Sequence, residues 1–197
     1  FFFQAEDAIR DSVASRGLGD VYKRQEISQL RLGPGRIHHC MRSIGAAEKA
    51  LELMATRGLS REAFGKKIAQ LGKNVELIAR ARIEIEACRL MVLRAAKAMD
   101  TMGNAEARVW VSAVKAMVPE KVCNIIDEAI QVHGATGISQ WTPLAGMYTG
   151  QRTLRLADGP DEVHHFVVGR FELARYGDEE IERSVYTPIG ERISSGP

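Results

Sequence analysis

The chain has 197 residues, of which 45% are hydrophobic, and its 27 lysine and arginine against 25 aspartate and glutamate residues give a formal net charge of +2. This balance argues against a nucleic-acid partner, and no apolar run approaches the about 20 residues that a membrane span requires. The three cysteines lie too far apart for a disulfide framework or a structural zinc site.

Residues 1–25 have an unusual sequence. Ser15–Gln25 resembles the translation of a transposase-type sequencing adapter, and Gln4–Asp11 resembles a translated flow-cell adapter that departs only at Ala8. We therefore expect residues 1–25 to be adapter-derived rather than native, the alternative being a genuine amphipathic leader. On this interpretation the native part opens in mid-protein at Glu26, and the chain is a C-terminal fragment.

Two helices are predicted in the first half of the native part. The first begins at Pro34, a residue suited to a first helical turn, and runs to about Arg57. Its apolar face comprises Ile37, Met41, Ile44, Ala47, Leu51 and Met54. The second runs from about Lys67 to Met102, because apolar residues recur there at steps of three and four. Its stripe comprises Leu71, Val75, Ile78, Ala81, Ile85, Cys88, Val92, Ala95 and Met99.

Further helices are predicted in the second half. One spans about Ala105–Val132 and contains Pro119, which should kink it. A short helix near Leu144–Arg155 and a last helix after Pro160 follow. No β alternation of useful length is present, so we predict an all-α, four-helix up-down bundle over residues 26–176 and a loose tail over residues 177–197.

Ser60 and Arg61 open the first motif that could carry chemistry. Ser60 is predicted to cap the second helix, which would place Arg61 among the free N–H groups of the first turn. A bound phosphate would make a cation favourable at this positive end of the helix dipole. The alternative is a solvent-facing arginine beside a helix start, and spacing alone favours it.

The segment Gln131–Gly137 ends the third helix in a glycine-containing loop. Glycine lets a backbone approach a ligand closely, which suits a binding loop. The alternative is an ordinary glycine cap, and the motif alone favours that interpretation.

Asp158 lies between apolar residues and the last helix. A carboxylate in a pocket that excludes water becomes a usable base near neutral pH. The alternative is that Asp158 caps the helix that Pro160 begins, with Asp161 and Glu162 in its first turn, and the local sequence alone favours it.

Metal binding is not predicted. Glu162 and His165 have the spacing used in di-iron bundles, but no second copy of that pair is present. His38 and His39 are adjacent and therefore point in different directions.

Taken together and in this order, these motifs resemble the C-terminal domain of the acyl-CoA dehydrogenase family. The matching elements are Arg61–Gly65, Gln131–Gly137 and Asp158–Val163, and the resemblance covers about residues 32–176. Within the family, the branch of members 10 and 11 is the one that Asp158–Val163 and Arg31–Cys40 resemble most.

The resemblance implies FAD-dependent oxidation of a fatty acyl-CoA to the trans-2-enoyl-CoA. The base that removes the α proton falls on Asp158, while some members place it on the first helix, at the position of Gly35 here. Glycine has no side chain and cannot act as a base, which strengthens the assignment of the base to Asp158. Asp158 is one methylene shorter than the common glutamate.

The resemblance also assigns binding residues. Arg61 and Phe64 correspond to contacts with the FAD of a neighbouring subunit, so a homodimer or homotetramer is implied. Further cofactor contacts fall on Gln131, Gly134, Ala135, Pro160 and Glu162, and substrate contacts on Arg36 and Gly159. We also expect Asp158 to lie near Arg61 and the bend after Gln131.

The resemblance further implies an electron-transfer flavoprotein or similar acceptor. The compartment would be the cytoplasm in a bacterium, and mitochondria or peroxisomes in a eukaryote. Two alternatives stay open: a non-catalytic helical module for oligomerisation or partner binding, and an acyl-CoA oxidase. A fragment of residues 26–197 is expected neither to hold FAD tightly nor to turn over, since upstream domains of the family supply most flavin contacts.

Overall fold

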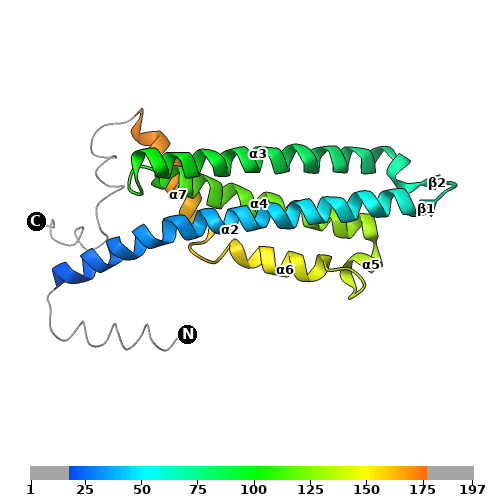
Figure 1. The fold of residues 1–197 in the computed structure, drawn as a ribbon, viewed down its shortest axis with the longest axis horizontal. Helices are drawn as coiled ribbons and strands as arrows, with labels where there is room; N and C mark the ends of the chain where they lie inside the picture. The colour runs from blue at the N-terminus through cyan, green and yellow to red at the C-terminus, as the bar shows by residue number, and fades with distance from the viewer. Residues whose placement is uncertain (1–17, 177–197) are drawn as a thin grey trace, which may run out of the picture.

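Three long helices lie alongside one another and form the frame of the protein (Figure 1). The computed structural model describes residues 18–176, so the predicted tail and the first part of the predicted adapter-derived segment lie outside the described residues. The three helices are α2 (Leu18–Ser60), α3 (Gly72–Met102) and α4 (Arg108–His133). Successive helices run in opposite directions, and the predicted all-α up-down bundle is confirmed (Figure 1).

The predicted start of the first helix at Pro34 is wrong. α2 begins at Leu18 and carries Pro34 in its interior. Proline removes one backbone hydrogen bond, but its fixed φ angle is itself helical, so the helix can continue through it with a bend. The N-terminal part of α2 is tilted relative to the rest (Figure 1).

The buried face of α2 differs by one residue from the predicted stripe. Cys40 is fully buried, whereas Met41 is 56% exposed. Most of the observed core positions follow alternating steps of three and four along the helix, namely Ile37, Cys40, Ile44, Ala47, Leu51 and Met54, and Ala50 is buried beside them. On α3, likewise, Leu77 is buried and Val75 is exposed.

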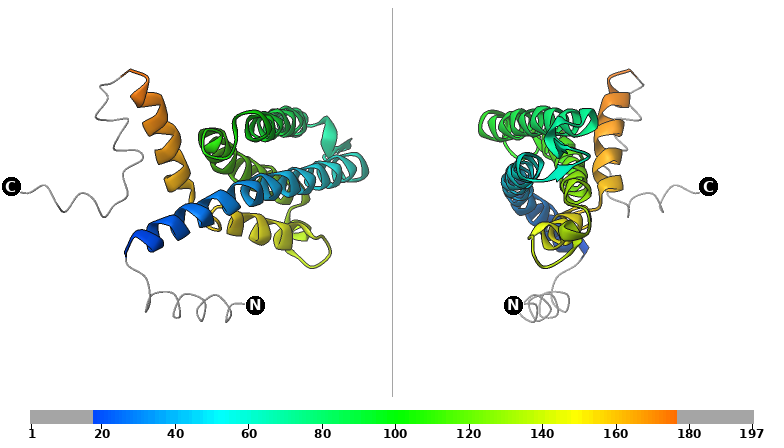
Figure 2. Two further views of the ribbon diagram at one scale, coloured as in Figure 1. Left: turned by 60° about the vertical axis from the view of Figure 1, so that its left-hand side comes forward. Right: turned by 90° about the vertical axis from the view of Figure 1, so that its right-hand side faces the viewer.

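α4 is the central helix of the bundle. It packs against α2 and α3, and against two later helices, α6 (Leu144–Leu154) and α7 (Asp161–Ala174). The one-turn helix α5 (Ala135–Ile138) links α4 to α6. α7 crosses the end of the bundle steeply instead of running along it (Figure 2). Because so many helices surround α4, it is buried on most sides, including at Pro119 and Lys115.

The predicted helix start near Lys67 is also wrong, because a β-hairpin connects α2 to α3. Strand β1 (Glu62–Ala63) pairs antiparallel with β2 (Lys66–Lys67), and a short 3₁₀ helix (Ile68–Gln70) precedes α3. The two turn residues, Phe64 and Gly65, both have positive φ, 52° and 72°. Two such residues form the turn type whose twist fits a tight hairpin.

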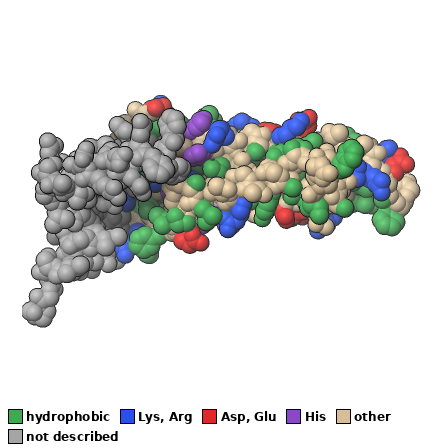
Figure 3. Space-filling view, turned by 90° about the horizontal axis from the view of Figure 1, so that it is seen from below, with side chains coloured by type: hydrophobic (Ala, Val, Ile, Leu, Met, Phe, Trp, Pro, Cys, Tyr) green, Lys and Arg blue, Asp and Glu red, His purple; other side chains and the backbone are tan. Residues whose placement is uncertain are grey.

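The described surface carries charges of both signs among exposed hydrophobic side chains (Figure 3). On the face shown in Figure 3, acidic and basic side chains are scattered, and histidine side chains reach the surface near one end. None of the helices within residues 18–176 combines the length and the apolar character needed to cross a membrane.

Candidate functional site

Asp158 lies in the loop between α6 and α7, in a left-handed backbone conformation with φ of 57°. Its side chain is 26% exposed, and its Oδ2 lies 3.1 Å from Nε2 of His39. The backbone carbonyl of Asp158 accepts a hydrogen bond from Arg36 Nε at 2.9 Å. Both partners project from α2, so the carboxyl group is held at the helix surface, half-buried and accessible.

The loop that carries Asp158 is also held by Lys115 of α4, from the buried side of the loop. This lysine is fully buried, and its ammonium group donates to the backbone carbonyl of Leu154 and, at 3.3 Å, to that of Gly159. Burial lowers the pKa of Lys115 from its ordinary value, while the nearby Asp161 and Asp158 carboxylates oppose that shift. Lys115 therefore fixes both ends of the segment that presents Asp158.

His164 of α7 packs against the same loop. Its Nε2 lies 3.3 Å from the carbonyl oxygen of Asp158, and its side chain is 2% exposed. Burial, with the positive charges of Arg36 and Lys115, lowers the pKa of His164 to about 4. His164 is thus neutral at physiological pH, and Nε2 carries the hydrogen that the Asp158 carbonyl accepts.

Two glycines leave room around Asp158. Gly159 has φ of 107°, and a Cβ on it would lie 2.9 Å from Nε2 of His164, so no side chain fits between the loop and α7. A Cβ on Gly35 of α2 would lie 4.0 Å from Oδ2 of Asp158. A longer side chain at position 35 would therefore enter the space beside the carboxylate.

The alternative that Asp158 caps the last helix is wrong. α7 begins at Asp161 with Pro160 at its N-cap, and no side chain caps it. Asp161 and Glu162 do occupy the first turn, where carboxylates are favoured. Asp161 is buried and pairs with Arg155 Nε at 2.6 Å, whereas Glu162 is exposed. The Asp158 side chain is consequently not used in holding the helix start.

The prediction that Ser60 caps a helix and places Arg61 in its first turn is wrong. Ser60 is the last residue of α2, and its hydroxyl donates to the carbonyl of Arg57 at 3.3 Å. The Arg61 N–H continues the helical pattern by donating to the same carbonyl at 3.0 Å. Arg61 thus lies between α2 and β1 with its side chain exposed, away from any helix N-terminus.

Phe64 is 94% exposed at the tip of the hairpin. A non-glycine residue in the left-handed region is strained by about 1–2 kcal/mol, and its φ of 52° places it there. The strained backbone of Phe64 is not offset by packing of its ring, which is almost fully exposed. Such a ring is a candidate for contact with a ligand or another subunit.

The glycine-containing loop after α4 lies at the same end of the bundle as the hairpin (Figure 1). Gly134 has φ of 63° and ends α4, with its N–H donating to the carbonyl of Gln131 at 3.2 Å. The glycine-cap interpretation is therefore confirmed. Gln131, Gly134 and Ala135 are all exposed, so this loop is also accessible to a ligand.

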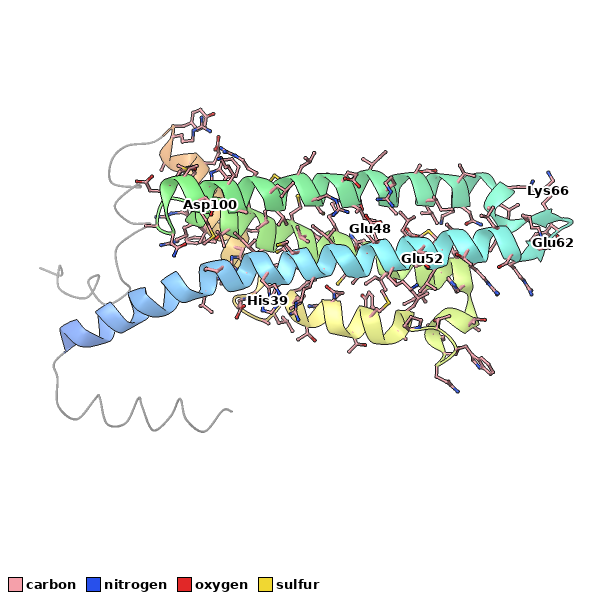
Figure 4. All side chains as sticks on the ribbon, viewed as in Figure 1. His39, Glu48, Glu52, Glu62, Lys66 and Asp100 are labelled. Carbon is pink, nitrogen blue, oxygen red and sulfur yellow. The ribbon has the colours of Figure 1, made fainter. Side chains whose placement is uncertain are left out.

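The predicted site residues fall into two groups at opposite ends of the bundle. The Asp158 group comprises Asp158, Gly159, Pro160, Glu162 and Arg36, with His39 beside them, and the hairpin group comprises Arg61, Phe64, Gln131, Gly134 and Ala135. His39 and the hairpin are labelled far apart in Figure 4, and the helical rise along α2 separates His39 from Arg61 by roughly 30 Å. The expectation that Asp158 lies near Arg61 and the Gln131 bend is wrong for a single protomer.

Three residues that contact Asp158 or its loop were missed in the sequence: His39, Lys115 and His164. His39 lies three residues after the predicted Arg36 and so shares one face of α2 with it, a spacing that could have linked them. Lys115 interrupts an otherwise apolar run, which marks a buried charge in need of partners. No local signal pointed to His164. Within residues 18–176 no group of three or more histidine, cysteine or acidic side chains is placed to hold a metal.

The family assignment follows from a match over most of the chain. Residues 26–173 match the model described as "Acyl-CoA dehydrogenase, C-terminal domain". The chain belongs to the acyl-CoA dehydrogenase family. Its sequence is 55% identical to rat acyl-CoA dehydrogenase family member 11 over 148 residues, which cover 75% of this chain and 19% of that protein. It is 53% identical to mouse family member 10 over 148 residues, 75% of this chain and 14% of that protein.

Solved structures of other acyl-CoA dehydrogenases share the fold of this chain. A Mycobacterium abscessus structure aligns with a TM-score of 0.75 at 55% identity, covering 77% of this chain and 37% of that one. Butyryl-CoA dehydrogenase from Megasphaera elsdenii aligns with a TM-score of 0.70 at 26% identity, covering 75% of this chain and 38% of that one. The chain thus spans about a fifth of the length of rat family member 11 and under two fifths of these solved chains.

Proposed function

We propose that this domain is part of an FAD-dependent acyl-CoA dehydrogenase that converts a fatty acyl-CoA to the trans-2-enoyl-CoA, with Asp158 as the base that removes the α proton. The observation that carries the proposal is the contact between Gly35 and Asp158, where a Cβ would lie 4.0 Å from Oδ2. The two positions at which the resembled family places its base thus converge on one point in space. Only Asp158 offers a carboxylate there.

The held conformation of Asp158 suits proton removal. A general base must keep one oxygen accessible in a fixed position. Arg36 and His164 fix the backbone of Asp158, and Lys115 fixes the loop on either side of it. The carboxylate therefore needs little reorganisation when a substrate α carbon arrives. In this proposal Arg36 and Gly159 contribute to the substrate side of the site.

The chemical groups that the hairpin group offers fit the proposed flavin cofactor. Arg61 offers a guanidinium for a phosphate, Phe64 an exposed ring for stacking, and Gln131 an exposed amide. Gly134 and Ala135 leave the nearby backbone accessible, and Pro160 and Glu162 would meet the cofactor at the other end. Bound FAD supplies a hydride acceptor for the β hydrogen. In this proposal a second copy of the chain completes each site, as a homodimer or homotetramer, and the separation of the two groups along one bundle supports it.

The electron acceptor in this proposal is an electron-transfer flavoprotein or a similar protein. The compartment would be the cytoplasm of a bacterium, or mitochondria or peroxisomes in a eukaryote. The relatives named above are acyl-CoA dehydrogenases by description, which supports the reaction class.

The test is Asp158→Asn in the flavin-loaded holoenzyme that contains this domain. We expect the variant to retain its yellow colour while anaerobic flavin reduction by short-, medium- or long-chain acyl-CoA falls by about 10²–10⁴-fold. Asp100→Asn, at an exposed position of α3, is the matched control and should leave the rate unchanged. Flavin reduction by Asp158→Asn at the wild-type rate would reject the base assignment. A wild-type protein that binds neither FAD nor acyl-CoA would favour the non-catalytic module.

A further inference from the structure

A chain of three side chains leads from the surface of α2 to the Asp158 carboxylate. Nη2 of Arg42 lies 2.8 Å from Nδ1 of His39. On the other side of the ring, Nε2 of His39 lies 3.1 Å from Oδ2 of Asp158. Arg42 is exposed, whereas the side chains of His39 and Asp158 are each 26% exposed, so the series begins at solvent and ends at a partly buried carboxylate.

The arginine determines which ring nitrogen of His39 carries the hydrogen. A guanidinium group donates hydrogen bonds and cannot accept them. In the contact with Arg42, Nδ1 is therefore the acceptor and has no hydrogen. The hydrogen of the neutral ring then lies on Nε2, which makes His39 the donor to Oδ2 of Asp158.

The other hydrogen-bond donors of the site act on the backbone of the loop and not on the Asp158 carboxylate. Arg36 and His164 contact its backbone carbonyl, and Lys115 contacts the carbonyls of Leu154 and Gly159. Among the described side chains, His39 is the donor to the carboxylate itself. Oδ1 makes no hydrogen bond within the part of the chain that the structure describes.

We propose that His39 is a positioning residue, which engages Oδ2 of Asp158 so that Oδ1 takes the substrate proton, and that Arg42 fixes the His39 tautomer needed for this. The proposal rests on the proposed function. The α proton forms an O–H bond at Oδ1, and the electron pair of the broken C–H bond becomes part of the new substrate double bond as the β hydrogen leaves as hydride to FAD. A carboxylate free to rotate would spend part of its time with neither oxygen in place.

The experiment compares His39→Leu with His39→Gln in the flavin-loaded holoenzyme, with the same acyl-CoA substrates. Leucine removes the donor, whereas glutamine places an amide N–H near the position of Nε2. We expect His39→Leu to lower kcat by about 10–100-fold with KM unchanged and a larger α-deuterium isotope effect on flavin reduction. His39→Gln should recover most of the rate.

A second measurement reads the tautomer directly. In ¹⁵N NMR of the holoenzyme, His39 should show a protonated Nε2 and an unprotonated Nδ1, and Arg42→Met should mix the two tautomers. Arg80→Met, at an exposed arginine of α3, is the matched control.

Equal losses in His39→Leu and His39→Gln, or a wild-type ring with a hydrogen on Nδ1 and none on Nε2, would overturn the positioning role. Wild-type kcat in His39→Leu, with Asp158→Asn inactive, would overturn it while leaving the base assignment intact. Activity in Asp158→Asn would instead remove the proposed function itself, and the positioning role with it.

Discussion

Gly35 and Asp158 face each other across the junction of α2 and the α6–α7 loop, with 4.0 Å between the position of a Gly35 Cβ and Oδ2 of Asp158. Residues far apart in the chain therefore share one point of the surface. A carboxylate built from either backbone could reach the same substrate atom.

This relationship predicts that the base can be moved. Asp158→Gly should lower flavin reduction by about 10²–10⁴-fold, and adding Gly35→Glu should recover at least tenfold of that loss. Glycine suits the left-handed backbone at position 158, and glutamate suits a helix interior better than glycine does. Gly35→Glu alone is the control, since it should crowd Asp158 and lower activity. A double variant no faster than Asp158→Gly would count against the convergence of the two positions.

The buried His164 predicts a dependence of stability on pH. Its pKa is lowered from 6.5 to about 4, mainly by burial. The unfolded chain therefore takes up a proton at a higher pH than the folded chain does. Neutral His164 therefore makes its full contribution to the free energy of unfolding above pH 6.5. This contribution declines as the pH falls toward 4, because the unfolded chain is protonated first, and the total decline is about 3 kcal/mol at most.

Urea unfolding of the wild type and of His164→Gln at several pH values would measure this contribution. The difference between the two proteins isolates His164 from the carboxylates that titrate in the same range. It should narrow by at least 1 kcal/mol between pH 6.5 and 4. A difference that stays constant with pH would show that His164 takes up its proton normally in the folded state.

Gly159 should not tolerate a side chain. Gly159→Ala forces alanine into φ of 107° and places its Cβ 2.9 Å from the buried ring of His164. We expect it to lower the free energy of unfolding by about 2–3 kcal/mol. Gly146→Ala is the matched control, because Gly146 lies in α6 with no atom within 4 Å of the added Cβ. That control should be stabilising by about 0.5–1 kcal/mol; similar losses in both variants would contradict the crowding at Gly159.

Phe64 should show opposite effects on stability and on cofactor binding. Phe64→Gly relieves the positive φ of 52° and should raise the free energy of unfolding by about 1 kcal/mol. If the ring contacts FAD, the same variant should release the cofactor more readily, measured by flavin fluorescence after dilution of the holoenzyme. Phe64→Tyr keeps the ring and should retain FAD. Unchanged FAD affinity in Phe64→Gly would rule out the contact.

Hydrophobic periodicity was sufficient to predict the long helices. In α3 the buried residues Ala81, Ile85, Cys88, Val92 and Ala95 all belong to the predicted stripe. Local rules failed where a neighbouring element changed the outcome. Ser60 has the composition of a helix start but ends α2, because the backbone there continues its hydrogen bonds to Arg57. Pro34 suits a first turn but lies within α2.

The residue sequence alone indicated the helical class, the place of the carboxylate Asp158 and the motifs shared with the family, because each depends on neighbours within a few positions of the chain. The packing of α2, α4 and α7 around one loop established the contacts of His39, Lys115 and His164 with Asp158 and its neighbours. It also placed Arg61 far from Asp158, because Asp158 contacts His39 and the length of α2 separates His39 from Arg61 by roughly 30 Å. Contacts between distant residues depend on how helix faces pack against one another, and periodicity gives the face of each helix but not its partner.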